Sequence, residues 1–466
     1  MRFDEEHQVA KDFLHYDLDQ PLLFQTDIRT WLPEDHIAIF ISDIIESMKL
    51  TEIFQQYKMG RGKPGYDPRL LLKILIYGYS KGIRSSRRLE QATFEDVAFR
   101  ILAANNHPDH DTIASFRARH IQSINSVFLE ILELCKKAKL LKCNHLSLDG
   151  TKIRASANKS KSKNYNQLLK SKEELQSEIQ KIMQEAEEID KAEDKKYGKG
   201  KRGDELPEAL KNKTKRKAAI EKLLNEIRQE AEEKKDDYPK KKEKMKTEDD
   251  QWMEENGLKF ERRAPKNPLN KPVEKIIESR RNPTDYDSRV MKSGISGGFI
   301  QGYNCQAAVD EDSQIIIAAQ VSNQTNDKGL IRPMIEKSIE NLNGQAPNFF
   351  TGDNGYYSER DIVWIEKKDI DPYIPPSKQD KGKRLIKTVD GMMSITEFMR
   401  FKLKSDVGKS IYRKRKTITE PVFGQMKNVR GFRNFLTRGL QKVNAEWQLI
   451  SIAHNIGKLH KLGYQA

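Results

Sequence analysis

Residues 411–427 read IYRKRKTITEPVFGQMK, a cationic run that contains one carboxylate, Glu420. A lone acid in such surroundings is poorly placed to bind a cationic partner, but it could share a metal ion beside a phosphate backbone. Acids and proline are also favoured in the first turn of a helix, so Glu420-Pro421 could simply mark a helix start. Further acids elsewhere in the chain would favour the metal site.

Length and charge point to a protein of several domains with a polyanionic partner. The 466 residues exceed what one hydrophobic core usually supports, so two or three domains are expected. The formal net charge of +15 indicates nucleic acid as the simplest partner. Residues 1–50 contain 11 Asp/Glu and 4 Lys/Arg, whereas residues 401–466 contain 14 Lys/Arg and 3 Asp/Glu. We therefore expect the polyanion site near the C-terminus.

The cysteines and the hydropathy pattern indicate a cytoplasmic location. Cys135, Cys143 and Cys305 form no CxxC pair and leave one thiol over, which is typical of reduced cysteines in the cytosol. The N-terminus has no apolar core behind a basic start, and no apolar run reaches the length of a membrane span. We expect no membrane partner.

The N-terminal part predicts a loose acidic arm followed by an all-helical domain that ends near residue 140. Asp67-Pro68 predicts a helix start, and Gly82 predicts its end. Arginines between the short helices fit a helix-turn-helix-like DNA-binding module, and equally a plain helical bundle with a solvated face. These arginines are Arg84, Arg87, Arg88, Arg117 and Arg119.

One loop of this domain is rich in histidine. His107, His110 and Asp111 could be metal ligands, but helix capping or hydrogen bonding within the loop is the favoured interpretation. In that interpretation Asp111 or Thr112 caps the helix that follows.

From residue 144 onward the pattern predicts strands alternating with helices. Residues 144–155 alternate like a strand that Asp149-Gly150 ends, and two apolar runs around residues 310–313 predict a β-hairpin. A helix follows, then a short strand that ends at Asp353, then another helix, a brief strand and a closing helical region from about Ser410. A mixed α/β sheet flanked by helices is the natural solution.

A charged segment interrupts this pattern. It is rich in Lys, Glu, Gln and Ala, and it predicts a helical hairpin or short coiled coil followed by a lysine-rich, partly disordered stretch. The predicted division of the chain is an N-terminal helical domain at 1–140, the first part of the core at 141–165, the insertion at 166–282 and the remainder of the core, with C-terminal basic helices, at 283–466.

Three acids could form one metal site. Asp149 and Asp353 are expected at strand ends, which converge on one edge of an open α/β sheet, and Glu420 near the start of a late helix. Oxygen-only ligands suit Mg²⁺ or Mn²⁺. Two such ions about 4 Å apart can promote an in-line phosphodiester displacement. Asp149-Gly150 and Asp353-Asn354-Gly355 could equally be ordinary turns.

Six stretches, in chain order, resemble the DDE-type transposases of bacterial insertion sequences. They are YDPRLLLKILIYGYSKGIRSSRRLE, PDHDTIASFRARH, LSLDGTKIRASANKSK, GGFIQGYNCQAAVD, FTGDNGYYSERDI and IYRKRKTITEPVFGQMKNVRGFRNFLTRGL. The resemblance implies an RNase H-like core, split by the insertion, behind the helical domain. It also implies that Asp149, Asp353 and Glu420 bind Mg²⁺ or Mn²⁺, as two ions.

The family's signature around the third acid is Tyr, a basic residue, Glu, and Lys seven positions later. Tyr412, Glu420 and Lys427 match it, and the spacing leaves the basic position open between Arg415 and Lys416. In a regular α-helix Lys427 would lie two turns from Glu420 on the same face. The remaining expected DNA contacts are Arg413, Arg430 and Arg433, of which Arg430 and Arg433 could equally form a general solvated face.

The function implied by this resemblance is transposition. Such an enzyme frees the 3′ ends of its element and joins them to target DNA, so the implied partners are the terminal inverted repeats, target DNA and further copies of the chain bound to DNA. Two alternatives remain open. One is a catalytically inactive DNA-binding protein descended from a transposase, and the other is a non-transposing nuclease with the same fold.

Overall fold

The structure is a computed structural model that describes residues 27–57, 65–197, 208–255, 271–293, 297–380, 382, 384–388 and 391–464. The acidic arm expected at the N-terminus lies largely outside these residues. Among the described residues, no helix is both long and apolar enough to cross a membrane.

The N-terminal part is helical, as predicted. Asp67 caps α3 by accepting a hydrogen bond from the Arg69 N–H at 2.7 Å, and Gly82 follows the helix with φ +77°. The predicted cap of α6 is wrong: Asp109 caps it, because its carboxylate accepts from the Thr112 N–H at 2.6 Å. The elements are η1 (Ile28–Trp31), α1 (Ile37–Ser47), α2 (Thr51–Phe54), α3 (Pro68–Ser80), α4 (Ser86–Glu95), α5 (Val97–Leu102), α6 (His110–Arg119) and α7 (Ile124–Lys137).

The second part is a mixed sheet. Its strands lie in the order β2-β3-β1-β5-β6, and β4 pairs with β3 beside β2. β1 is antiparallel to β3 and parallel to β5, which is parallel to β6. This confirms the predicted mixed α/β sheet and the hairpin β3–β4. The strands are β1 (His145–Arg154), β2 (Arg289–Lys292), β3 (Phe299–Asp310), β4 (Ile316–Ser322), β5 (Phe349–Thr351) and β6 (Asp371–Tyr373).

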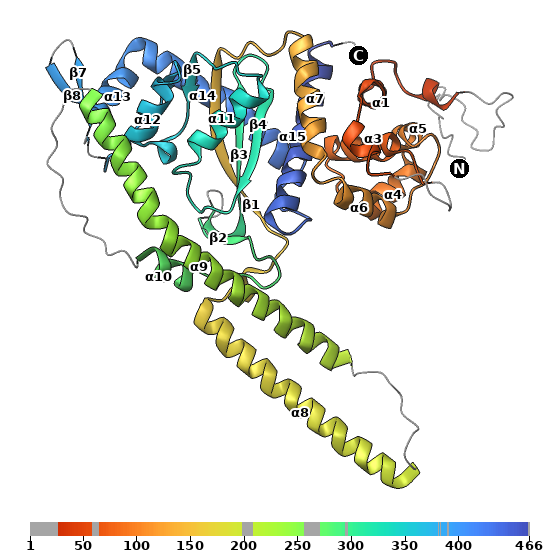
Figure 1. Cartoon of the computed structure of the whole chain (residues 1–466). Coiled ribbons are helices and arrows are strands. Elements are labelled where there is room, and N and C mark those ends of the chain that lie inside the picture. Colours follow the sequence, from red (N-terminus) through yellow and green to blue (C-terminus); the bar gives the residue numbers. More distant parts are fainter. Residues whose placement is uncertain are drawn as a thin grey trace, which may run out of the picture.

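Helices cover both faces of the sheet (Figure 1). One face packs against α11 (Ile331–Asn341), α12 (Glu359–Glu366) and α13 (Ile395–Lys404). The opposite face packs against α14 (Asp406–Gly424) and α15 (Leu440–Lys461), and the same hydrophobic core continues into the N-terminal helices. A small hairpin, β7 (Leu385–Thr388) and β8 (Gly391–Ser394), precedes α13 and was not predicted.

The charged insertion forms a long helical hairpin that projects from the sheet (Figure 1). Its helices are α8 (Tyr165–Tyr197) and α9 (Glu208–Glu255), with α10 (Lys271–Glu278) at the base. In the stretch that was predicted to be partly disordered, α9 continues through residues 238–255 and past Pro239. Lysine and glutamate are good helix formers, so a high charge alone does not prevent a helix.

The strand that carries Asp149 is longer than predicted. Asp149-Gly150 does not end β1, which pairs with β3 from Leu146 opposite Asp310 to Arg154 opposite Gly302. Gly150 pairs with Gln306 in this ladder. A Cβ at Gly150 would lie 2.5 Å from the Gln306 side-chain nitrogen, so the close packing here favours glycine. Pairing with the long β3 therefore overrides the local Asp-Gly turn signal.

The predicted position of Glu420 near a helix start is wrong. α14 begins at Asp406, and Glu420 lies among its last five residues. Pro421 is therefore inside the helix, where it provides no N–H for the Thr417 carbonyl. The Gln314 side chain donates a hydrogen bond to that carbonyl at 2.8 Å instead. A role of Glu420-Pro421 as a helix start is excluded.

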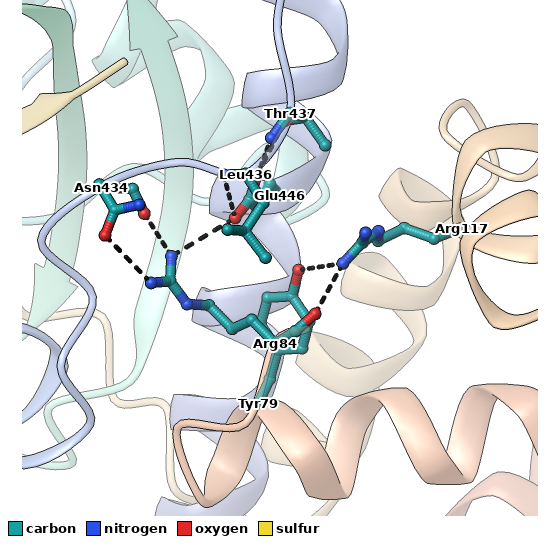
Figure 2. Close-up of polar contacts among 7 residues, drawn as sticks. All are labelled: Tyr79, Arg84, Arg117, Asn434, Leu436, Thr437 and Glu446. Carbon is teal, nitrogen blue, oxygen red and sulfur yellow. Dashed lines mark hydrogen bonds and ion pairs between the residues drawn. The ribbon is translucent and has the colours of Figure 1, made fainter. Parts of the chain in front are cut away.

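The N-terminal helices are fixed to the second part by a buried polar cluster (Figure 2). Arg84 donates hydrogen bonds to Asn434, and its guanidinium lies 3.6 Å from a carboxylate oxygen of Glu446, whose side chain is 0% exposed. Glu446 also accepts from the N–H groups of Leu436 and Thr437 and from the Thr437 hydroxyl.

Two predicted arginine roles are corrected by this cluster. Arg117 donates to the Arg84 carbonyl at 3.0 Å and to the Tyr79 hydroxyl at 3.4 Å. Arg84 therefore holds the two parts of the chain together, and Arg117 supports Arg84 from within the N-terminal part. Both arginines are used in these contacts rather than in a DNA-reading or solvated face. The remaining arginines of that set, Arg87, Arg88 and Arg119, are exposed.

Breaking this cluster should destabilise the protein. We expect Glu446→Ala to lower the free energy of unfolding by about 3–5 kcal/mol, because it leaves Arg84 with an uncompensated charge in a buried interface. Urea unfolding would measure the change. Glu340→Ala is the control, because Glu340 forms an exposed pair with Lys337 and should cost no more than about 1 kcal/mol. Equal losses for the two variants would contradict the assignment.

Candidate active site

Asp149 and Asp353 lie on neighbouring parallel strands. Ser147 on β1 pairs with Thr351 on β5, and each aspartate follows two residues later in an extended backbone. Continuing the register therefore places the two carboxylates side by side at one edge of the sheet. The prediction that these two acids converge is thus supported by the strand pairing itself.

The Asp149 carboxylate is buried against α14. Burial raises the pKa of Asp149, which the nearby charge of Asp353 raises further, while Arg415 and the Gly150 N–H oppose the rise. The guanidinium of Arg415 lies 3.6 Å from a carboxylate oxygen, and the Thr419 hydroxyl donates to the same oxygen at 3.3 Å. Burial therefore disfavours the ionised form of Asp149, and Arg415 offsets this effect only in part.

Asp353 is in a similar state. Burial raises the pKa of its carboxyl, the charge of Asp327 raises it further, and Arg415 and Lys152 act in the opposite direction. One carboxylate oxygen accepts the Gly355 N–H at 2.8 Å. The turn Asp353-Asn354-Gly355, which forms η3 (Asn354–Tyr356), therefore orients the acid as well as ending the strand.

Arg415 and Lys416 lie in different environments. Arg415 lies near Asp149, and its guanidinium is 5.9 Å from the centre of the Tyr412 ring. Its buried Nε has no hydrogen-bond partner among the described residues. Lys416 is exposed to solvent. Arg415 is thus the basic residue at the acids, and it retains an unused donor there.

Glu420 is not gathered with the two aspartates. It is exposed on α14, one residue after Thr419, which contacts Asp149. Within the described ranges, no group of three or more His, Cys, Asp or Glu side chains is arranged to hold a metal. The structure therefore brings together two of the three predicted acids and leaves the third on the adjacent helix.

A π-helical turn, η4 (Gln425–Val429), continues α14 and contains Lys427. Its wider turns change the helical phase, so the same-face alignment of Lys427 with Glu420 expected for a regular α-helix does not hold. Lys427 is half-buried. Burial lowers the pKa of its ammonium, and the charges of Cys305 and Asp149 oppose this shift. Lys427 therefore lies toward Asp149, while Glu420 faces solvent.

The other predicted DNA contacts are in different environments. Arg413 and Arg433 are exposed, and Arg433 donates to the Lys427 carbonyl and to Asn428. Arg430 is only partly exposed, and burial lowers the pKa of its guanidinium. A Cβ added at Gly457 of α15 would lie 3.3 Å from an Arg430 terminal nitrogen, so Arg430 lies against that helix.

The histidine loop is explained by hydrogen bonds. His110 Nδ1 lies 2.8 Å from a Glu90 carboxylate oxygen, and His107 Nδ1 lies 3.2 Å from the Thr93 hydroxyl. The His107 ring also stacks on Phe94, with centroids 3.8 Å apart. These contacts support loop hydrogen bonding over metal binding, although the capping residue is Asp109.

Two charged residues near the acids were not predicted as site residues. Asp327 lies 3.7 Å from the Lys152 ammonium, and both influence the pKa of Asp353. The sequence around Asp327 reads Asn326-Asp327-Lys328-Gly329 and indicates only a helix start. Lys152 lies three residues after Asp149 in the sequence. The strand was expected to end at Asp149-Gly150, so the sequence did not indicate that Lys152 continues it.

The donor set fits a hard divalent cation in part. Asp149 and Asp353 provide carboxylate oxygens, which such ions prefer, and the two acids are close enough for the charge of Asp353 to raise the pKa of Asp149 in addition to burial. A third ligand would have to come from Glu420 or from solvent. The residues therefore suit Mg²⁺ or Mn²⁺ and do not suit a thiolate-bound metal.

We expect Asp353→Asn to stabilise the metal-free protein at pH 8. A raised pKa means that the folded state binds the proton more tightly, so wild type loses stability as pH rises through that pKa, whereas Asn cannot ionise. The gain in melting temperature should disappear as pH falls toward 3.8, the ordinary value of the acid. Asp111→Asn, at an exposed acid, is the control. A loss of stability that is the same at every pH would contradict this interpretation.

Two family models match the chain in the predicted order. Residues 26–119 match a transposase domain (DUF772), and residues 274–456 match a transposase DDE domain, so the matches together cover more than half of the chain. A DDE domain implies an RNase H-like fold, which agrees with the mixed sheet and its flanking helices. No curated protein and no solved structure matches the chain. The chain belongs to the DDE-type transposases of insertion sequences.

Proposed function

We propose that this transposase cuts DNA at the ends of its element and joins the freed 3′ ends to target DNA, with a divalent metal held by Asp149, Asp353 and Glu420. The observation that carries the proposal is the parallel pairing of β1 with β5 up to Ser147 and Thr351, two residues before Asp149 and Asp353, with the pKa of both acids raised by burial. Glu420 would complete the site from α14, whose Thr419 already contacts Asp149.

The bound metal, two Mg²⁺ or Mn²⁺ ions, would supply activation of the attacking oxygen and stabilisation of the leaving oxygen. The chain's own residues orient and neutralise the substrate. The Arg415 guanidinium is 3.6 Å from Asp149, so it can turn to a phosphate oxygen once the acids are otherwise neutralised. The Arg415 guanidinium lies over the Tyr412 ring, which can make a cation–π contact with it.

The surface beyond the acids suits the DNA backbone. Arg413, Lys416 and Arg433 are exposed, and Lys427 lies toward Asp149, so all four can contact phosphates. Arg430, which lies against α15, is better explained by packing.

The division of labour within the chain is also part of the proposal. We assign DNA-end recognition to residues 1–140, catalysis to residues 141–165 and 283–466, and an unassigned accessory role to residues 166–282. Exposed Arg87, Arg88 and Arg119 are the candidate contacts of the N-terminal domain. Action on paired element ends in the cytoplasm, on nucleoid DNA, would require further copies of the chain.

One observation favours a second candidate, an inactive DNA-binding protein. Glu420 is exposed and is not gathered with the two aspartates. This candidate retains DNA binding and predicts no cleavage by the wild type. A non-transposing nuclease would cleave, but it would not join a 3′-hydroxyl end to a second duplex.

The test is cleavage and joining of terminal-repeat DNA with Mg²⁺. We expect Asp149→Asn, Asp353→Asn and Glu420→Gln each to lower the cleavage rate at least about 100-fold, because even partners of metal ligands cost 10–100-fold when lost. DNA binding should persist. Glu340→Gln, at an exposed acid of α11, is the control.

Each outcome assigns or removes a role. Activity that survives in Glu420→Gln alone removes that residue from the site. Activity that survives in both aspartate variants overturns the proposed metal centre. Wild-type protein that binds DNA tightly and releases no product identifies the inactive alternative, and hydrolysis without joining identifies the nuclease.

A further inference from the structure

We infer that Lys152 is a phosphate-binding residue of the active site and that Asp327 is the positioning residue that holds it there. This inference rests on the proposed function, because it takes the ligand to be the DNA backbone. Neither residue belongs to the three acids or to the cationic stretch 411–427.

Lys152 lies on β1, three residues beyond Asp149 and opposite Asn304 of β3. Its side chain is 20% exposed, so it is accessible to a ligand. Its charge acts on the pKa of both Asp353 and Lys427. Alternate side chains of a strand point to opposite faces, so Lys152 lies on the other face of β1 from Asp149. Its ammonium is 3.7 Å from Asp327, which lies against Gly355 of the turn that carries Asp353, so Lys152 is near that acid.

The Asp327 carboxylate is held by hydrogen bonds from two side chains of β3. One of its carboxylate oxygens accepts from the side-chain amides of Asn304 at 2.7 Å and Gln306 at 3.1 Å. Gln306 in turn accepts a hydrogen bond from the buried Tyr356 hydroxyl, one residue after Gly355. The network fixes the direction of the carboxylate and links it to the turn that carries Asp353.

The backbone leaves room for this carboxylate at two glycines. A Cβ at Gly150 would lie 3.2 Å from one oxygen of Asp327, and a Cβ at Gly355 would lie 3.3 Å from the other. Each glycine follows one of the two aspartates by one or two residues. Asp327 thus lies between the two strand ends that form the site.

The pairing of Lys152 with Asp327 is loose. The ammonium nitrogen is 3.7 Å from the second carboxylate oxygen, which is longer than a direct hydrogen bond of 2.7–3.2 Å. An ammonium group has three donors, so Lys152 can attract Asp327 and donate to a phosphate oxygen at the same time. A lysine with only a structural role would be expected to bond its partner directly.

The first experiment measures DNA affinity of the full chain against salt concentration, without divalent metal. Replacing one phosphate contact lowers the slope of log K against log[salt] by about 0.9 for duplex DNA. We expect this decrease for Lys152→Gln and an unchanged slope for Lys152→Arg, which also shows that the position tolerates substitution. Lys142→Gln is the matched control, because Lys142 forms a Lys–Asp pair with Asp312 near the opposite end of β1 and β3 and is 68% exposed.

The second experiment tests the positioning role of Asp327 through cleavage rates. Asp327→Asn should lower the rate while the salt slope stays at the wild-type value. If Asp327 acts through Lys152, the double variant Asp327→Asn/Lys152→Gln should be no slower than Lys152→Gln alone, since the two effects are then not additive. Additive losses would overturn the positioning role.

Failure of this inference differs from failure of the proposed function. Wild-type protein without salt-dependent DNA binding would overturn the proposed function itself. Normal wild-type binding with an unchanged slope in Lys152→Gln would overturn only the assignment of Lys152.

Discussion

Two partly buried carboxylates of like charge, Asp149 on β1 and Asp353 just after the neighbouring strand β5, are the constraint on which the rest of the structure depends. Asp149 and Asp353 would repel each other if both were ionised, and burial weakens the solvation that would relieve them. The chain opposes this repulsion with Arg415 and Lys152, which approach from α14 and from β1 itself. The divalent ions of the proposed function would relieve this repulsion, so in that proposal stability is exchanged for function.

The position of α14 depends on elements far from it in sequence. The loop after η4 pairs with the end of β1, because the Phe435 N–H donates to the Arg154 carbonyl and the Arg154 N–H donates to the Arg433 carbonyl. Arg84 of the N-terminal helices holds Asn434 in the same loop (Figure 2). Gly82 of the N-terminal helices also lies against the start of this loop, because a Cβ at Gly82 would lie 2.5 Å from the Arg430 carbonyl oxygen. The N-terminal domain therefore helps to hold the active site in addition to its proposed DNA contacts.

Local signals in the sequence were sufficient for much of the fold and for part of the site. The strand pattern before Asp353, the β3–β4 hairpin and the Asp67 helix start are encoded by neighbouring residues, and the structure contains all three. Features that depend on distant partners were not predictable in this way. The Gln314 side chain bonds the Thr417 carbonyl that Pro421 leaves without a donor in α14. Pairing with the long β3 extends β1 past Asp149, and Glu446 forms an ion pair with Arg84 at the interface between the two parts of the chain. Asp327 and Lys152 were missed for the same reason, because only tertiary pairing brings them together.

Titration of the protein with Mn²⁺, followed by electron paramagnetic resonance, tests the account of the two acids most directly. The proposed ligands Asp149 and Asp353 predict saturable Mn²⁺ binding by wild type. Because the pKa of both acids is raised, protons should be released on binding if part of either acid is protonated at the pH of the experiment. Saturable binding should disappear in the double variant Asp149→Asn/Asp353→Asn while the protein remains folded. Unchanged Mn²⁺ affinity and stoichiometry in that double variant would show that the two aspartates are not the metal site, and the account would be wrong.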